Sequence, residues 1–209
     1  MLIIYDFTPR ITIFTDNITT LESLLIYAVK TITYQSDYLG NGFEFATINQ
    51  PDDYEGKVVA TVIRKQCSMP SNKAVLYVHG FNDYFFQSDM AHRFNEKEYH
   101  FYAIDLRKYG RSTLPHQKSN NMRSLTEYFA DLDEALDIIR QEGNEQVLLS
   151  GHSTGGLLVT LYASERVGNE KFDTIFCNSP FYDMNMPGYQ KRLLVPLVAL
   201  FGKYFPDVL

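Results

Sequence analysis

One stretch, residues 146–156, decides the fold of this 209-residue chain and reads Q-V-L-L-S-G-H-S-T-G-G. Its first four residues form an apolar run typical of a buried strand. The pattern Gly151-x-Ser153-x-Gly155 follows, and residues 157–163 are apolar, as in a packed helix. Strand, glycine turn and helix in this order predict a sharp turn that presents the Ser153 hydroxyl as a nucleophile. The alternative is a surface turn rich in Gly and Ser, and the flanking elements disfavour it.

The turn explains why glycines stand on both sides of the serine. Gly151 and Gly155 lack the Cβ atoms that would collide in so tight a turn. The helix after the turn directs its N-terminal N–H groups and their partial positive charge toward the serine, which suits a developing oxyanion.

Composition and charge restrict the class of protein. The chain is 45% hydrophobic and 21% charged, which is ordinary for a globular domain with one sizeable core. A net charge of −6 without a basic cluster argues against a nucleic-acid partner. Cys67 and Cys177 are too far apart to suggest a disulfide scaffold or a zinc site. We expect no metal and no cofactor.

The apolar segments are too short for a membrane span. Residues 1–6 lack the basic region of a signal peptide. The longest apolar run, Leu193 to Phe201, contains Pro196 and falls well short of the ~18 residues that a span needs. We therefore predict a cytoplasmic protein with no stable membrane insertion.

Periodicity predicts strands that alternate with helices. The predicted strands cover residues 43–48, 57–65, 74–78, 100–104, 146–149 and 172–177. The predicted helices cover residues 87–95, 125–140 and 157–163. The first two strands should form an antiparallel pair. The later alternation predicts an α/β fold with a mostly parallel sheet and helices on both faces.

Four motifs carry a resemblance to a known family. They are L-Y-V-H-G-F at 76–81, D-L-R-K-Y-G-R-S at 105–112, G-H-S-T-G-G at 151–156 and N-S-P at 178–180. With these motifs, the chain resembles α/β-hydrolases of the serine aminopeptidase-like, monoacylglycerol lipase and lysophospholipase group. The second motif departs from the family's pattern at Lys108, where glycine is common.

The resemblance implies three parts along the chain. Residues 1–38 form an N-terminal extension with one helix. Residues 39–186 form the α/β-hydrolase core with its first six strands. Residues 187–209 begin a lid segment. We therefore expect the last two strand-helix units of the α/β-hydrolase fold to be missing from this sequence.

The resemblance also implies a chemistry. Ser153 would attack a carboxylic ester of a small acyl or lipid substrate and form an acyl-enzyme. The backbone N–H groups of Phe81 and Thr154 would form the oxyanion hole. Gly80 would let its loop approach the substrate, and His79 would support that loop through hydrogen bonds. An aminopeptidase-type serine hydrolase is the alternative within the enzyme class.

The expected proton acceptor is missing, because no histidine follows Ser153. In this fold the order is serine, acid, histidine. The chain is therefore a fragment of a longer hydrolase, a catalytically inactive binding module, or one that receives its histidine from a second chain. The other polar residues near the motifs are predicted to be structural: His92, His100, His116, His152, Asp105, Arg107 and Asp183.

Overall fold

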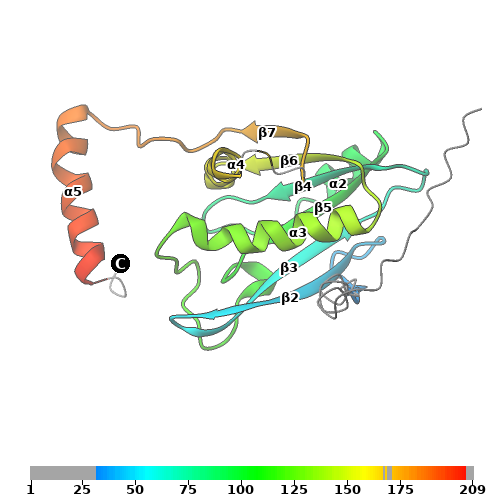
Figure 1. Cartoon of the computed structure of the whole chain (residues 1–209), viewed down its shortest axis with the longest axis horizontal. Helices are drawn as coiled ribbons and strands as arrows, with labels where there is room; N and C mark the ends of the chain where they lie inside the picture. The colour runs from blue at the N-terminus through cyan, green and yellow to red at the C-terminus, as the bar shows by residue number, and fades with distance from the viewer. Residues whose placement is uncertain (1–31, 167, 169–170, 206–209) are drawn as a thin grey trace, which may run out of the picture. The chain divides into compact units, whose positions relative to one another are not determined.

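The computed structural model describes residues 32–166, 168 and 171–205. In this part of the chain, seven strands form one mixed sheet in the order β1-β2-β3-β5-β4-β6-β7 (Figure 1). The N-terminal helix predicted from the sequence falls outside the described residues. Residues 32–38 of the predicted extension do contribute a short strand to the sheet.

The strands change from antiparallel to parallel across the sheet. They are β1 (Gln35–Ser36), β2 (Glu44–Asp53), β3 (Gly56–Lys65), β4 (Lys73–Val78), β5 (Tyr99–Asp105), β6 (Gln146–His152) and β7 (Thr174–Asn178). From β1 to β5 along the sheet the neighbours are antiparallel, and β5, β4, β6 and β7 are parallel. The predicted antiparallel pair and parallel core are confirmed. The strand β1 was missed, because two residues carry no periodicity.

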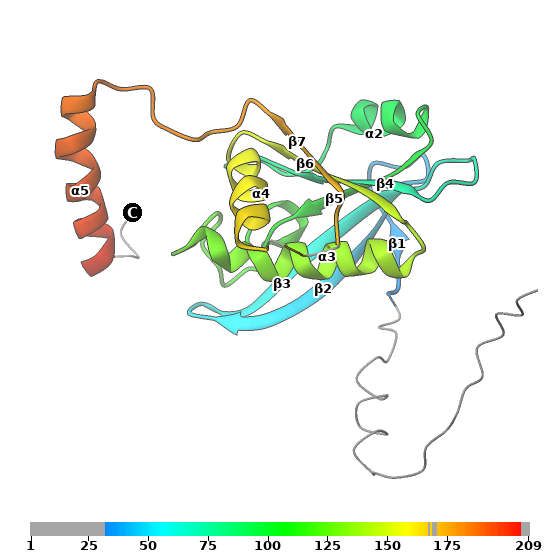
Figure 2. The same ribbon diagram turned by 45° about the horizontal axis from the view of Figure 1, so that its top comes forward.

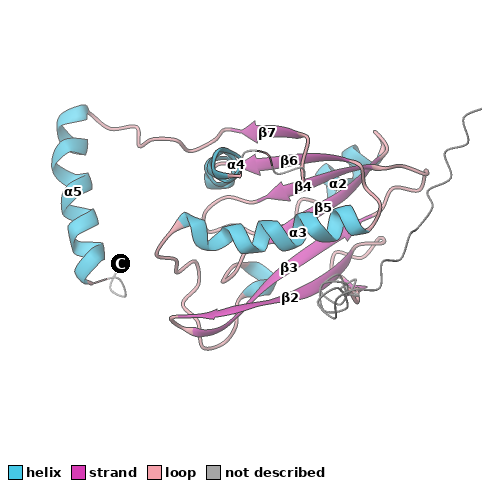
Figure 3. Ribbon diagram, viewed as in Figure 1, coloured by secondary structure: helices cyan, strands magenta, loops and turns pink. Residues whose placement is uncertain are grey.

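Four α-helices accompany the sheet in the described part of the chain (Figure 3). They are α2 (Ser88–Asn95), α3 (Phe129–Gln141), α4 (Thr154–Glu165) and α5 (Gly188–Tyr204). The helix predicted at 125–140 begins instead as a 3₁₀ turn, Leu125–Tyr128, whose N-terminus is capped by Ser124 and Glu127. Within the described residues, no helix is long and apolar enough to cross a bilayer.

The two faces of the sheet carry separate apolar clusters. On β4, Leu76 and Val78 pack with residues of α3 and α4, whereas Val75 and Tyr77 pack with Ala91 of α2. This division follows from the alternation of side chains along a strand. Figure 2 shows α2 on one face and α3 on the other. Helices on both faces, as predicted, leave the carboxyl ends of the parallel strands open for a site.

Candidate active site

The turn at Ser153 has the strained backbone that the sequence predicts. The strand β6 ends at His152 and α4 begins at Thr154, with Ser153 between them at φ +52° and ψ −119°. A non-glycine residue at such angles costs about 1–3 kcal/mol and is retained where the surroundings fix it. Ser153 is half-buried. The turn therefore holds a serine in one defined position at the end of the parallel sheet.

The neighbouring glycines are required by close backbone contacts. A Cβ atom on Gly151 would lie 2.4 Å from the carbonyl oxygen of Gly155. A Cβ on Gly155 would lie 2.3 Å from the carbonyl oxygen of His79. Both distances are far below a van der Waals contact, so the steric reason given for these glycines is confirmed.

The segment after β7 completes the turn from the other side. The Ser153 N–H donates to the carbonyl oxygen of Asn178 at 3.1 Å, and the Phe181 N–H donates to that of Ser153 at 3.0 Å. A Cβ on Gly156 would lie 2.8 Å from the Pro180 Cβ. Sequence reasoning identified the N-S-P motif but missed Asn178 and Phe181 as partners of the serine. Backbone contacts between distant segments do not depend on residue type, so the sequence does not indicate them.

The loop after β4 lies against the serine. A Cβ on Gly80 would lie 3.2 Å from the Ser153 Cβ, so the two loops are direct neighbours. In the part of the chain that the structure describes, the N–H groups of Phe81 and Thr154 have no hydrogen-bond acceptor. Two such donors beside a nucleophile can bind an oxyanion. Their catalytic role stays a prediction.

Both ring nitrogens of His79 are engaged by the backbone. Nδ1 donates to the carbonyl oxygen of Gly80 at 2.7 Å, and Nε2 accepts from the Leu106 N–H at 3.2 Å. Complete burial lowers the pKa of His79, so the ring is neutral. His79 ties the loops after β4 and β5 together and has no nitrogen left to accept the serine proton.

Acidic and basic side chains brace the loop after β5. Asp105 accepts from the Phe85 N–H at 2.8 Å and from the Arg111 guanidinium at 2.8 Å. Arg107 forms a buried ion pair with Asp131 at 2.7 Å. Burial lowers the pKa of Arg107, but its bonds to Asp131 outweigh this effect and raise it. The predicted structural roles of Asp105 and Arg107 are confirmed.

The departure at Lys108 has a visible consequence. Lys108 has φ +65°, in the left-handed region that glycine adopts without strain. The loop thus keeps a conformation that suits glycine, although a lysine occupies the position.

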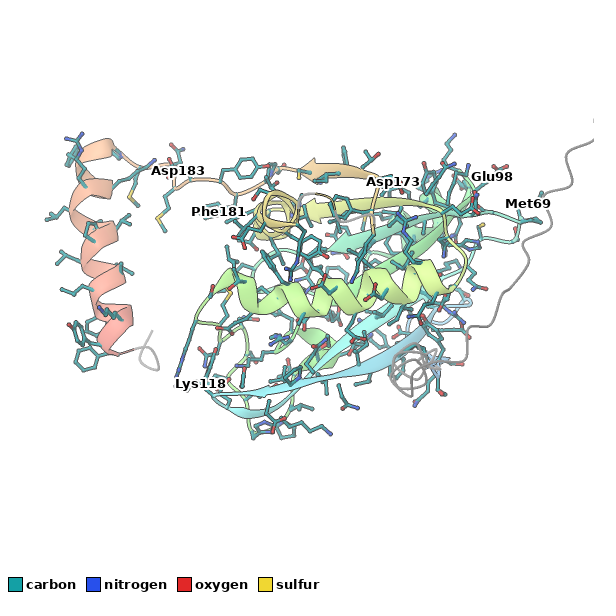
Figure 4. The ribbon with its side chains drawn as sticks, viewed as in Figure 1. Met69, Glu98, Lys118, Asp173, Phe181 and Asp183 are labelled. Carbon is teal, nitrogen blue, oxygen red and sulfur yellow. The ribbon has the colours of Figure 1, made fainter. Side chains whose placement is uncertain are left out.

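His152 directly precedes Ser153 at the end of β6, and a Cβ on Gly80 would lie 3.7 Å from its ring. The other predicted residues lie away from the serine turn in the chain. His92 is on α2, His100 on β5 and His116 in an exposed loop. Asp183 is exposed and forms an ion pair with Lys191, which lowers the Asp183 pKa. Figure 4 shows Asp183 beyond Phe181, on the way to α5. Among the described residues, no three His, Cys, Asp or Glu side chains gather as metal ligands.

A cavity of about 200 Å³ opens beside the two loops. Most of its lining is apolar, and it includes both predicted oxyanion donors. It is lined by His79, Gly80, Phe81, Leu106, Tyr109, Met122, Leu125, Tyr128, Thr154, Gly155, Leu157, Leu158 and Phe181. A small apolar chamber with unpaired N–H groups at its edge can hold an apolar group beside a polar reacting centre.

A parallel sheet with a serine on its strand-to-helix turn and a glycine loop beside it defines the α/β-hydrolase class. The family model described as "Serine aminopeptidase, S33" matches residues 69–209. The chain belongs to this family of hydrolases, and the predicted fold class is confirmed.

Solved structures show the same fold. A monoacylglycerol lipase from Paleococcus ferrophilus is 24% identical, with 70% of this chain and 53% of that chain covered and a TM-score of 0.56. A carboxyl esterase from Bacillus coagulans is 18% identical, with 77% of this chain and 51% of that chain covered and a TM-score of 0.61. This chain thus spans about half the length of these proteins. Epoxide hydrolase 4 of Mus musculus is 34% identical over 90 residues, which are 43% of this chain and 23% of that protein.

Proposed function

We propose that Ser153 is the nucleophile of a serine hydrolase that cleaves carboxylic esters through an acyl-enzyme. The Ser153 Oγ attacks the carbonyl carbon while a base takes its proton. The tetrahedral oxyanion lies between the Phe81 and Thr154 N–H groups and collapses, and the alcohol leaves with a proton. Water then attacks the acyl-enzyme in the same way and releases the carboxylic acid.

The observation that carries this proposal is the strained turn at Ser153. Its φ of +52° is held by hydrogen bonds to Asn178 and Phe181 and by glycines at which a Cβ would clash with backbone oxygens. Strain of this kind is retained where a group must be presented in a fixed position. Losing a single oxyanion donor costs about 3–4 kcal/mol of transition-state stabilisation, so the adjoining N–H groups would lower the barrier substantially.

The base is proposed to come from polypeptide other than the described residues. His79 cannot serve, because Nδ1 bonds to the Gly80 carbonyl oxygen, Nε2 already accepts from the Leu106 N–H, and burial lowers the ring's pKa and so makes it a weaker base. A histidine on a continuation of the chain or on a second chain would complete the proton transfer. The competing proposal is a catalytically inactive module that binds an acyl group.

The cavity supports an acyl ester as the substrate class. Its volume of about 200 Å³ is below the ~300–1,000 Å³ of most ligand pockets, so it suits one short acyl chain. The likeness to a monoacylglycerol lipase and a carboxyl esterase favours a lipid or a small ester. The family description raises aminoacyl amides as a second class.

The test is labelling with alkyl fluorophosphonates, which phosphonylate an activated serine. The wild-type chain, and the longest natural polypeptide that contains it, would be compared with Ser153→Ala. Ser179→Ala is a matched control, because Ser179 also has positive φ, at +48°, and lies in the adjoining segment. In a polypeptide that also supplies the base, we expect labelling that Ser153→Ala abolishes and Ser179→Ala retains, and a short alkyl probe should react faster than a long one.

Two other outcomes would favour the competing functions. Saturable acyl-ligand binding without labelling in either polypeptide would favour the inactive module. Faster turnover of aminoacyl amides than of esters would favour the peptidase.

A further inference from the structure

Lys108 is a fully buried lysine that is held by two carboxylates. Its side chain is 1% exposed, and Nζ lies 2.6 Å from a carboxylate oxygen of Asp53 and 2.6 Å from one of Glu55. Burial lowers the pKa of Lys108, but the close pairing with Asp53 and Glu55 outweighs this effect and raises the pKa, so the ammonium stays charged. A buried ammonium is tolerated only when it is paired in this way. The pairing fixes Lys108 to the turn between β2 and β3.

The same turn also holds the segment that includes Asn120. A carboxylate oxygen of Glu55 accepts from the Lys118 N–H at 3.1 Å. The Tyr54 hydroxyl donates to the carbonyl oxygen of Asn121 at 3.1 Å. Figure 4 shows Lys118 beside the β2–β3 turn. The turn therefore fixes the segment on both sides of Asn120.

Asn120 links this assembly to the loop beside Ser153. Its N–H donates to the carbonyl oxygen of Lys108 at 3.0 Å. Its side-chain Nδ2 donates to Oδ1 of Asn82 at 3.1 Å. Asn82 has φ +52° and directly follows Phe81, whose N–H is proposed to bind the oxyanion. Two hydrogen bonds thus connect the buried lysine to the loop that carries this donor.

We propose that Lys108, clamped by Asp53 and Glu55, is a positioning residue that acts through Asn120 to fix the loop at 79–82. The inference rests on the proposed function in one respect: the loop it fixes carries the Phe81 N–H that is proposed to bind the oxyanion. A glycine at position 108 would adopt φ +65° more easily but could not reach the β2–β3 turn. The lysine therefore adds an anchor that the family's common glycine cannot supply.

Amide hydrogen exchange of the whole chain, measured by mass spectrometry, tests the clamp. In Lys108→Met we expect the peptide covering 79–86 to exchange about tenfold faster, the size of effect that losing one hydrogen-bonded anchor gives. Lys108→Gly should do the same without backbone strain, which keeps the test usable if the methionine variant fails to fold. Lys73→Met is the matched control, because Lys73 pairs with Glu98 at 3.4 Å on β4; it should leave this peptide unchanged.

A double variant tests the route through Asn120. Asn120→Ala should accelerate exchange at 79–86 as Lys108→Met does, and the double variant should be no faster than Asn120→Ala alone. In a polypeptide whose Ser153 reacts with a fluorophosphonate, Lys108→Met should lower the maximal rate of labelling and leave the probe's affinity unchanged. A structural defect would instead accelerate exchange in β6 as well.

The outcomes separate the clamp from the proposed function. Unchanged exchange at 79–86 in both Lys108 variants, or additive effects in the double variant, would overturn the clamp. If the Lys108 variants exchange faster at 79–86 but the wild-type protein is never labelled at Ser153, the clamp is supported and the hydrolase proposal is contradicted.

Discussion

Two apolar helices of this molecule, α4 and α5, have opposite surroundings. The helix α4 buries Leu158, Val159 and Tyr162 against the sheet. The helix α5 contains a longer apolar run, yet none of its residues is buried, and Leu197 is 53% exposed. The sequence marks both helices alike by an apolar run, at 157–163 and at 193–201. Only contact with the sheet decides whether such a helix stabilises the fold.

The sheet shows the same contrast. Side chains on β4 and β6 lie between covered faces, whereas β7 is an edge strand with Phe176 at 56% exposure. The serine turn belongs to the covered region, although its hydrogen bonds to Asn178 and Phe181 reach the exposed one. The buried core thus lies mainly in the segments before residue 166, whereas the site geometry also depends on the segment at 178–181.

The strongest test of this contrast makes the same Gly→Ala substitution near the start of α4 and near the start of α5. Gly155→Ala places a Cβ 2.3 Å from a backbone oxygen and should cost on the order of 4 kcal/mol of unfolding free energy. Gly188→Ala, in the first turn of α5, meets nothing within 4 Å and should change stability by less than about 0.5 kcal/mol. Urea unfolding followed by circular dichroism measures both. Equal losses would show that α5 is packed as tightly as α4.

A second pair of variants tests side-chain burial alone. Leu158 is 1% exposed, so Leu158→Ala should leave a cavity and cost roughly 3 kcal/mol. Leu197→Ala on α5 removes the same atoms from a side chain that water already reaches, and should cost less than about 0.5 kcal/mol. Thermal unfolding of the two variants beside wild type measures the difference. A large loss from Leu197→Ala would reveal a covering contact for α5 in solution.

Local patterns predicted the parallel strands, the serine turn and the steric need for Gly151 and Gly155. These features depend on residues close in the chain, so spacing and residue type were sufficient. The support of the loop by His79 was implied only by the family resemblance, and the structure supplies its hydrogen bonds.

The missed features join distant segments. The hydrogen bond from Ser153 to Asn178 joins backbone atoms that every residue possesses, so the residue types do not indicate it. The Lys108 clamp depends on a turn more than 50 residues earlier in the chain. The exposure of α5 was not predictable, because an apolar run gives no sign of what covers it.

The smallest expected effect is a difference between the two regions in how the free energy of unfolding depends on pH. Burial lowers the pKa of His79 below the ~6.5 of the unfolded chain, so below that pH the unfolded state binds the proton more strongly. His79 thus contributes stability above about pH 6.5 that is lost as pH falls, by up to ~1.4 kcal/mol per pH unit. In the exposed region, the Asp183 pKa is lowered by Lys191, so that ion pair is lost only below about pH 4.

Urea unfolding of wild type and variant between pH 7 and 5 tests the histidine, and Asp183 stays ionised throughout that range. In His79→Asn the slope of unfolding free energy against pH should be shallower than in wild type by up to ~1.4 kcal/mol per pH unit. An unchanged slope in His79→Asn would mean that the ring titrates normally in the folded protein. His79 would then be free to exchange protons near Ser153, and the case for a base outside the described residues would lose its main support.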